Sequence, residues 1–378
     1  MAKVPFFRAS IDEDDIDRVT AVLRTDFLTT GPVAAELEAN LAQYTDTNAA
    51  ITVTSCTAAL HLCLVALDIR PGDEIITTPM TFVATANAIV HAGAKPVFVD
   101  VEPETGNIDV SKVEAAITDR TRVVMPVHLY GQMVDMVGLS EVAEARGIEI
   151  IEDAAHALES RRGSVSLGSH SRAACLSFYA TKNITSGEGG AIVTRDSEFA
   201  DRLRKLRLHG MTAGAADRYT GTYRHYGVTE PGWKYNMSDI QAALLIGQLR
   251  RIDDLLEKRT EAFNRYRDAL GDYNELRLPQ WLPNSRHAAH LFTVQVRPEI
   301  RDDMLHGLQQ RGIGVAVNFR AVHLYEAYGE RFNYGPDQFP HAERMGASTI
   351  SLPLFPGITG AEQAAVVDAV DATLKSLG

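Results

Sequence analysis

The sequence has few of the features that mark secreted, membrane-spanning or metal-binding proteins. Cysteine occurs three times in 378 residues, at Cys56, Cys63 and Cys175. The odd number excludes a full disulfide framework, and the three lack the paired spacing of a metal site. No uninterrupted apolar run approaches the roughly 18 residues needed to span a bilayer, and the chain opens without an apolar signal segment. We therefore expect a cytoplasmic protein with no metal site and no membrane contact.

Positive charge is also scarce. Lys and Arg total 37 against 49 for Asp and Glu, so the formal net charge is −12. This balance argues against bulk binding to nucleic acid or to anionic membranes, although it allows a local basic pocket for a phosphate. What is present, 45% hydrophobic and 23% charged residues, is typical of a globular chain, and the length allows two or three lobes.

From residue 49 onward, short apolar runs alternate with helical patterns. This alternation predicts an α/β fold with a mainly parallel sheet covered on both faces, where ligands gather at the carboxyl ends of the strands. The predicted strands are 49–53, 74–77, 96–99, 122–127, 148–151, 173–178 and 191–194, and the predicted crossover helices are 58–67, 85–92, 110–117 and 139–146. Two earlier helices are predicted at 11–23, capped by Ser10, and at 33–44.

The pattern changes after residue 194. A helix is predicted at 197–208, and an irregular polar segment at 210–235 has the length of a functional or partner-contacting loop. A long helix at about 238–270 then marks the junction between two predicted domains. These are an N-terminal arm with a large domain, residues 1–245, and a small α+β C-terminal domain, residues 246–378.

Lys182 follows a predicted buried strand and lies in a polar turn that contains Gly187, Gly189 and Gly190. A lysine partly removed from water loses solvation of its charged form, so it can become a free amine that attacks a carbonyl to form a Schiff base. The alternative is a solvated loop lysine, which is the commoner case. The residue alone does not decide between the two.

Other strand ends carry polar or aromatic residues. Asp153 and His156 follow one strand, where a carboxylate can pair with a buried cation, although a helix cap and a structural histidine are the alternatives. The turn at Thr57 opens a helix and offers an anion site or plain capping. Phe82 follows another strand and can stack on a flat ring or pack in the core. Asn236, taken alone, is interpreted as an ordinary turn asparagine.

In combination, these segments resemble the DegT/DnrJ/EryC1/StrS family of pyridoxal-phosphate-dependent sugar aminotransferases. The resemblance runs nearly end to end and implies the type I fold of pyridoxal-phosphate enzymes, which is that of aspartate aminotransferase. The matching segments are Leu28-Thr29-Thr30-Gly31-Pro32, Glu152-Asp153-Ala154-Ala155-His156, Ser177-Phe178, Thr181-Lys182-Asn183, Gly187-Glu188-Gly189-Gly190, Tyr235 to Ala243 and Ser351-Leu352-Pro353-Leu354.

The resemblance implies a role for each of these residues. Lys182 is expected to bind the cofactor, pyridoxal 5′-phosphate, as a Schiff base and to move the proton during transfer. Asp153 would pair with the ring nitrogen, Phe82 would stack on the ring, and His156 would lie near its 3-hydroxyl group.

The phosphate contacts are implied in the same way. Thr57 and Ser177 match phosphate-binding positions through their hydroxyl groups, and Ala58 does so through its backbone N–H. Asn236 matches an asparagine that reaches the phosphate of the neighbouring subunit. A homodimer with shared active sites is therefore expected.

The substrate is implied less sharply. Residues 311–323 are similar to the segment of members that aminate C4 of UDP-linked 4-keto sugars, with L-glutamate as the amino donor. Arg320 and His323 are then candidate substrate contacts, as is Thr29 in the first matching segment; a surface Arg/His pair is the alternative. Two departures, Phe82 in place of a frequent Trp and Leu158-Glu159-Ser160 after the aspartate segment, bear on sugar specificity.

Three rival functions follow from the same resemblance. An aminotransferase for a 3-keto or other keto sugar would use the same residues. The family's dehydratases have histidine where Lys182 stands, which argues against that branch. A non-catalytic regulatory member would be expected to carry a helix-turn-helix or a basic face, and a chain of charge −12 predicts neither.

Overall fold

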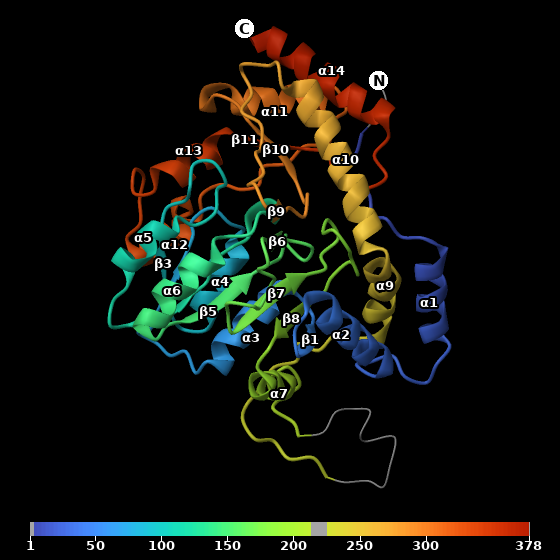
Figure 1. The fold of residues 1–378 in the computed structure, drawn as a ribbon, viewed down its shortest axis with the longest axis vertical. Helices are drawn as coiled ribbons and strands as arrows, with labels where there is room; N and C mark the ends of the chain where they lie inside the picture. Colours follow the sequence, from blue (N-terminus) through green and yellow to red (C-terminus); the bar gives the residue numbers. More distant parts are fainter. Residues whose placement is uncertain (1–3, 213–224, 378) are drawn as a thin grey trace.

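A seven-stranded sheet forms the centre of the larger part of the molecule (Figure 1). The computed structural model describes residues 4–212 and 225–377. The strand order is β1-β8-β7-β5-β4-β2-β3. Only β8 runs against the others, pairing antiparallel with both β1 and β7. The strands are β1 (Ala49–Val53), β2 (Glu74–Thr77), β3 (Lys95–Phe98), β4 (Thr121–Val124), β5 (Glu149–Asp153), β7 (Ala173–Ser177) and β8 (Gly190–Thr194). This confirms the predicted mainly parallel sheet.

Helices cover both faces of this sheet because its strands are apolar on both sides. Ile51, Ile151 and Cys175 face one layer, while their neighbours Ala50 and Ile150 belong to the cluster on the other face. The first layer consists of α3 (Cys56–Ala66), α4 (Val83–His91) and α7 (Ser197–Leu206), and the second of α2 (Pro32–Thr45), α6 (Met136–Arg146) and α9 (Asp239–Arg250).

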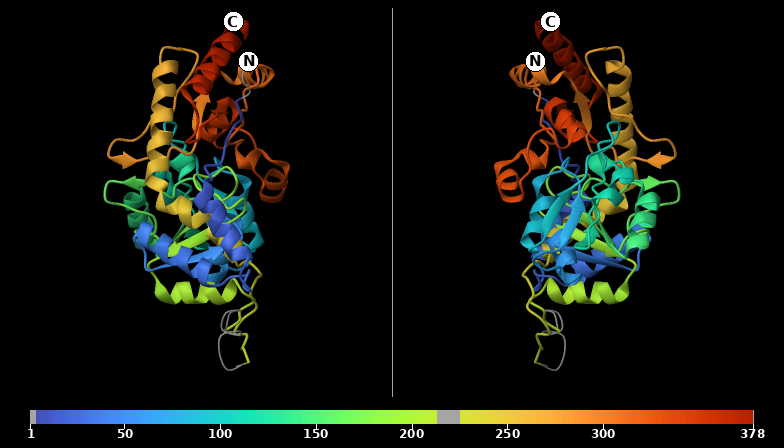
Figure 2. Two further views of the ribbon diagram at one scale, coloured as in Figure 1. Left: turned by 90° about the vertical axis from the view of Figure 1, so that its right-hand side faces the viewer. Right: turned by 90° about the vertical axis from the view of Figure 1, so that its left-hand side faces the viewer.

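A third apolar cluster lies beyond the sheet, at the end of the molecule where both chain ends are found (Figures 1 and 2). Its elements are α10 (Ile252–Leu270), β10 (Phe292–Gln295), α11 (Arg301–Gln310), β11 (Thr349–Leu352) and α14 (Gly360–Leu377). Val4 is fully buried in the same cluster and forms a parallel bridge with Ile313. The N-terminal arm therefore packs on the C-terminal part, whereas the sequence places it with the large domain. A division near residue 245 stays a prediction.

Some expected boundaries differ from the structure. The predicted helix at 238–270 is two helices, α9 and α10, which meet at Arg251 with φ −109° and ψ 20°. The first helix, α1 (Glu13–Leu23), is capped by Asp12 rather than Ser10, because Asp12 and Asp15 form a reciprocal capping box. Residues 213–224 of the predicted irregular segment lie outside the described residues.

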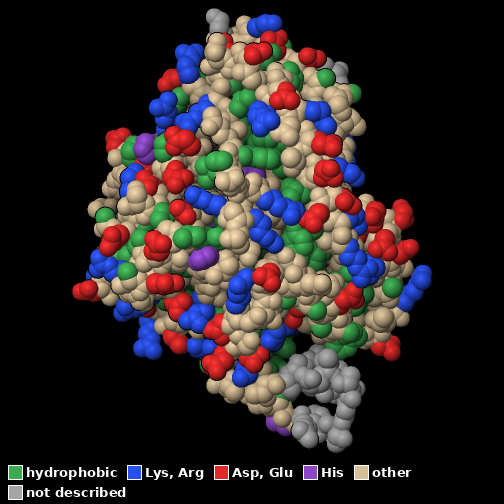
Figure 3. Space-filling view, viewed as in Figure 1, with side chains coloured by type: hydrophobic (Ala, Val, Ile, Leu, Met, Phe, Trp, Pro, Cys, Tyr) green, Lys and Arg blue, Asp and Glu red, His purple; other side chains and the backbone are tan. Residues whose placement is uncertain are grey.

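Shorter elements complete the fold. They are α5 (Val110–Val113), β6 (Arg161–Arg162), β9 (Ser285–Arg286), α12 (Glu326–Phe332), α13 (Pro340–Ser348) and four 3-10 turns at 114–116, 129–131, 298–300 and 322–324. Within the described ranges, no helix is both long and apolar enough to cross a bilayer. On the face shown in Figure 3, acidic and basic side chains are interspersed.

Candidate active site

A cavity of about 470 Å³ opens at the carboxyl ends of β1, β2, β5 and β7. Six residues that the sequence singles out line it: Thr57, Phe82, Asp153, His156, Ser177 and Lys182. The rest of the wall is formed by Phe6, Ser55, Cys56, Leu60, Thr81, Ala84, Thr85, Val127, Ala155, Tyr179, Thr181, Glu188, His290, Leu291, Asn318 and Phe319. The sheet brings together the segments that follow its strands, because parallel strands end at the same edge.

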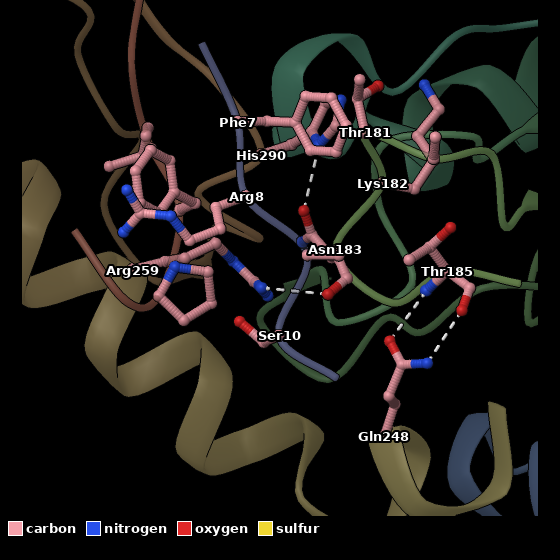
Figure 4. A pocket seen from close by; sticks show the side chains of 15 residues that line it. Phe7, Arg8, Ser10, Thr181, Lys182, Asn183, Thr185, Gln248, Arg259 and His290 are labelled. Atoms are coloured by element: carbon pink, nitrogen blue, oxygen red, sulfur yellow. Dashed lines mark hydrogen bonds between the residues drawn. The ribbon is translucent and has the colours of Figure 1, made fainter. Parts of the chain in front are cut away.

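Lys182 lies in the turn between β7 and β8. Its backbone N–H donates to the carbonyl of Tyr179 at 2.9 Å. The turn is anchored to α9, where the Gln248 amide bonds the backbone N–H and C=O of Thr185 at 3.0 and 2.8 Å (Figure 4). Within the described chain, the ammonium of Lys182 has no hydrogen-bond partner. Burial lowers the pKa of Lys182 to about 8, although the nearby Cys56 and Asp153 favour its charged form.

Asp153 ends β5 with its carboxylate in the cavity. Thr85 donates to Oδ2 at 2.8 Å and the backbone N–H of Ala155 donates to Oδ1 at 3.1 Å. The thiol of Cys56 lies 3.9 Å from the same Oδ1. Burial raises the pKa of Asp153, and the Thr85 bond acts in the opposite direction. A buried, oriented carboxylate of this kind is stabilised by a cation placed beside it.

Helix α3 begins at the cavity. The side chain of its N-cap, Ser55, accepts the backbone N–H of Ala58 at 3.1 Å, so this N–H is already engaged. The hydroxyl of Thr57 makes no bond within the described residues, and the Ser177 hydroxyl accepts only the N–H of Tyr179 at 3.4 Å. The Thr57 hydroxyl at the helix N-terminus and the Ser177 hydroxyl at the end of β7 together form a suitable place for an anion.

Phe82 and His156 complete this part of the wall. Phe82 is 57% exposed, which argues against the core-packing alternative. Nδ1 of His156 accepts the backbone N–H of Tyr130 at 3.3 Å. Burial, and then Lys182, lower the pKa of His156 well below its usual range, so the ring is neutral. The remaining proton therefore lies on Nε2.

The structure does not bring five predicted residues into this wall. Ala58 lies one residue beyond it, and Thr29 is exposed, with its carbonyl accepting the N–H of Asp239 at 3.2 Å. The Asn236 side chain donates to the Thr30 hydroxyl at 2.6 Å and accepts from Lys234 at 2.6 Å.

Arg320 and His323 also lie outside. The Arg320 guanidinium is 5.3 Å from the Tyr325 ring and donates to the carbonyl of Leu324 at 3.3 Å. His323 is fully buried and pairs with Glu343 at 3.0 Å. Their role as substrate contacts stays a prediction, and from the same segment Asn318 and Phe319 line the cavity.

Several lining residues were missed by the sequence reading. Cys56 has a readable signal, because it lies just after the end of β1, whereas Thr85 lies inside α4. His290 and Asn318 have none, since they reach the site only through the packing of distant segments.

Comparison with known proteins gives agreement over almost the whole chain. The profile of the DegT/DnrJ/EryC1/StrS aminotransferase family matches residues 9–371. The spore coat polysaccharide biosynthesis protein SpsC of Bacillus subtilis is 41% identical over 379 residues, covering 98% of this chain and 97% of that protein. A UDP-4-amino-4-deoxy-L-arabinose–oxoglutarate aminotransferase of Shewanella sediminis is 40% identical over 380 residues, covering 97% of each. Among solved structures, the PLP form of Spr1654 from Streptococcus pneumoniae superposes with a TM-score of 0.92 at 30% identity, covering all of both chains.

Proposed function

The chain belongs to the DegT/DnrJ/EryC1/StrS aminotransferase family, and on that basis we propose that it transfers the amino group of L-glutamate to C4 of a UDP-linked 4-keto sugar. It is a pyridoxal-phosphate-dependent sugar aminotransferase. The choice of nucleotide and carbon is supported by the Shewanella relative, whose name specifies a UDP-4-amino sugar and oxoglutarate. The product would be a nucleotide-linked amino sugar.

The cavity residues fit pyridoxal phosphate. The hydroxyls of Thr57, in the first turn of α3, and of Ser177, at the end of β7, would hold its phosphate. Asp153 would face the ring nitrogen, where the negative charge of its carboxylate would favour the protonated nitrogen, although burial by itself raises the pKa of Asp153. Phe82, exposed within the cavity, would cover one face of the ring. When bound, this cofactor supplies the carbonyl that takes up the amino group and an electron sink for the carbon that loses a proton.

The protein's own residues account for orientation and proton movement. Because Nδ1 of His156 accepts the N–H of Tyr130, the N–H at Nε2 would be the donor to the ring hydroxyl. Lys182 would hold the cofactor covalently and, once displaced, move a proton at Nζ between the reacting carbons. Because its pKa is about 8, a useful fraction of Lys182 is neutral near pH 7.5.

The single observation that carries this assignment is the meeting of Lys182 and Asp153 in one cavity beside the N-terminus of α3. Each group alone has an ordinary alternative. Together they provide the nucleophile, the charge partner and the phosphate site that one cofactor requires.

We propose in addition a homodimer in which Asn236 serves the partner's site. One N–H of its amide is taken by Thr30 and its oxygen by Lys234, so one N–H is left for a phosphate oxygen.

Spectroscopy and a substrate panel test the assignment. Purified protein with pyridoxal phosphate should absorb in the violet, and Lys182→Ala should lose this band together with at least about 100-fold in rate. The exposed Lys112→Ala is the matched control and should keep both.

The protein would then be loaded with pyridoxamine phosphate and offered 3-keto and 4-keto UDP-, GDP- and dTDP-sugars. We expect turnover of UDP-4-keto sugars; preference for a 3-keto sugar contradicts the C4 assignment. Full activity in Asp153→Asn contradicts the role given to Asp153, and a colourless protein that takes up no cofactor contradicts the function as a whole.

A further inference from the structure

His290 lies just before β10 and lines the active-site cavity from the side of the third cluster. It also lines a second space of about 20 Å³ behind the Lys182 turn, which Figure 4 shows from close by. Only 5% of the residue is exposed. His290 has no role in the cofactor contacts proposed for this cavity, and the hydrogen bonds around it determine which of its two ring nitrogens carries the hydrogen.

The hydrogen bonds around Asn183 fix the first nitrogen. The Asn183 amide nitrogen donates to both carboxylate oxygens of Glu159, at 2.9 and 3.0 Å, and to the carbonyl of Ala288 at 2.9 Å. All of these partners are acceptors, so the opposite amide orientation would set oxygen against oxygen. Arg259, itself only 2% exposed, holds Glu159 in place through a buried ion pair.

The Asn183 amide oxygen is left facing His290. The distance from this Oδ1 to Nδ1 of His290 is 3.0 Å (Figure 4). Because the oxygen can only accept, Nδ1 must carry the hydrogen. A neutral imidazole has one N–H, so Nε2 of His290 is a lone-pair acceptor. Burial, assisted by His156 and Lys182, lowers the pKa of His290 well below its usual range and keeps the ring neutral.

His156 has the opposite arrangement. Its Nδ1 accepts the N–H of Tyr130, so its Nε2 is a donor. The two rings stack with centroids 4.4 Å apart and planes at 27°. The same patch of wall therefore presents one donor, which the ring hydroxyl of the cofactor would use, and one acceptor.

The acceptor has no partner within the described residues. Nε2 of His290 forms no hydrogen bond there, yet it is not among the side-chain atoms that are both fully buried and without a hydrogen-bond partner. It is therefore accessible from the spaces that His290 lines. A buried acceptor left without a donor in the bound state costs binding free energy, so a ligand that fills this wall is expected to bring a donor.

We propose that His290 is a substrate contact whose Nε2 accepts a hydrogen bond from the sugar hydroxyl on the carbon next to the one that is aminated. The inference rests on the proposed function. The reacting carbon must come within reach of Lys182. His290 is hydrogen-bonded to Asn183, which follows Lys182 in the chain. The acceptor therefore serves groups close to that carbon. L-glutamate and 2-oxoglutarate carry no hydroxyl there and should be nearly indifferent to it.

Two variants separate the nitrogens. His290→Asn places an amide N–H near Nδ1, which keeps the bond to Asn183 and removes the acceptor. His290→Gln places an amide oxygen near Nε2 and restores an acceptor. With UDP-4-amino-4-deoxy-L-arabinose and 2-oxoglutarate as substrates, we expect His290→Asn to raise KM for the sugar by about 10-fold. KM for 2-oxoglutarate should stay within about twofold, and His290→Gln should recover most of the loss.

A binding measurement supplies a readout independent of turnover. Calorimetric titration of the same amino sugar should show the same 10-fold weakening in His290→Asn, with the violet absorbance unchanged as evidence of an intact site. An analogue that lacks the hydroxyl next to the amino-bearing carbon should bind the wild type and His290→Asn equally.

Three results would overturn the inference. The first is an unchanged KM for the sugar in His290→Asn, and the second is an equal rise in KM for the sugar and for 2-oxoglutarate. The third is that His290→Asn weakens binding of the deoxy analogue as much as it weakens binding of the hydroxylated sugar. Failure of the proposed function looks different, because the wild-type protein would then turn over no sugar in the panel, whatever residue stands at position 290.

Discussion

Lys182 combines two environments that act on its ammonium in opposite directions. Burial removes water from the charged form, whereas Asp153 and Cys56 favour that form. Burial is the larger effect, and the result is a pKa near 8. A side chain tuned in this way can hold a proton and release it within the same pH range, as a group that moves protons between two carbons must.

The pH dependence of amine labelling should report this tuning. In protein free of cofactor, acylation of Lys182 followed by mass spectrometry should be half-maximal near pH 8, whereas an ordinary lysine reaches this point at about 10.4. Well below pH 8 the group is mostly protonated and unreactive, and the free amine appears as the pH rises. Asp153→Asn removes a charge that favours the ammonium and should lower the midpoint further. A midpoint near that of an ordinary lysine contradicts the burial of Lys182.

At the residue scale, the sequence allows prediction of the site residues that follow strands of the sheet. Lys182, Asp153 and Thr57 each stand within a few positions of a strand end, and strand ends can be read locally. His290 comes from a segment whose position depends on how the third cluster docks, which no local pattern encodes. Asn318 was missed for the same reason: the direction of the chain at that turn decides which side chain faces the cavity.

At the scale of elements, the start of β8 holds the site together. Gly190 pairs with Val53 at the end of β1 and with Ser177 at the end of β7. It also lies against the backbone at the start of α3. A Cβ atom at position 190 would lie 2.4 Å from the carbonyl carbon of Ser55 and 2.6 Å from the backbone nitrogen of Cys56. Backbone atoms cannot move aside as a flexible side chain can, so the space is reserved for glycine.

Gly190→Ala should therefore affect both stability and cofactor binding. We expect the free energy of unfolding to fall by about 1–3 kcal/mol, measured by urea denaturation, because the start of α3 must shift. Pyridoxal phosphate should bind more weakly, since the same shift moves Thr57. Gly357→Ala is the matched control: it is exposed and its Cβ would meet no atom within 4 Å. Equal stability and affinity in the two variants would show that α3 tolerates the displacement.

The alternation of apolar runs and helical patterns was enough to predict the parallel part of the sheet. The features that differ from the prediction have physical causes. The reversed direction of β8 leaves no trace in its residues, because a fully buried strand is apolar in either direction. The break between α9 and α10 falls at Arg251, an ordinary helix former. There the guanidinium bonds Asp15 and the carbonyl of Ser10, a contact made across more than 200 residues.

At the scale of the whole molecule, the proposed homodimer makes the two sites interdependent. Each site would take Lys182 and Asp153 from one subunit and Asn236 from the other. The three residues then belong to two complementation groups, which subunit mixing can distinguish.

Mixed dimers of Lys182→Ala and Asn236→Ala subunits should regain activity. Random pairing gives half mixed dimers with one intact site each, so about a quarter of wild-type activity is expected at limiting cofactor. Mixing Lys182→Ala with Asp153→Asn should restore nothing, because each site of such a dimer lacks one of the two residues. Recovery in the second mixture, or none in the first, contradicts the sharing of Asn236 between subunits.

The bridge between Val4 and Ile313 has a consequence for the order of events during translation. Residue 4 leaves the ribosome long before its partner has been made. At about 5–20 residues per second, the arm waits about 15–60 s for Ile313 to be synthesised. During that time the apolar side chains of Val4 and Phe6 lack the C-terminal surface against which they later pack. The segment around Val4 is thus synthesised well before the surface on which it is placed.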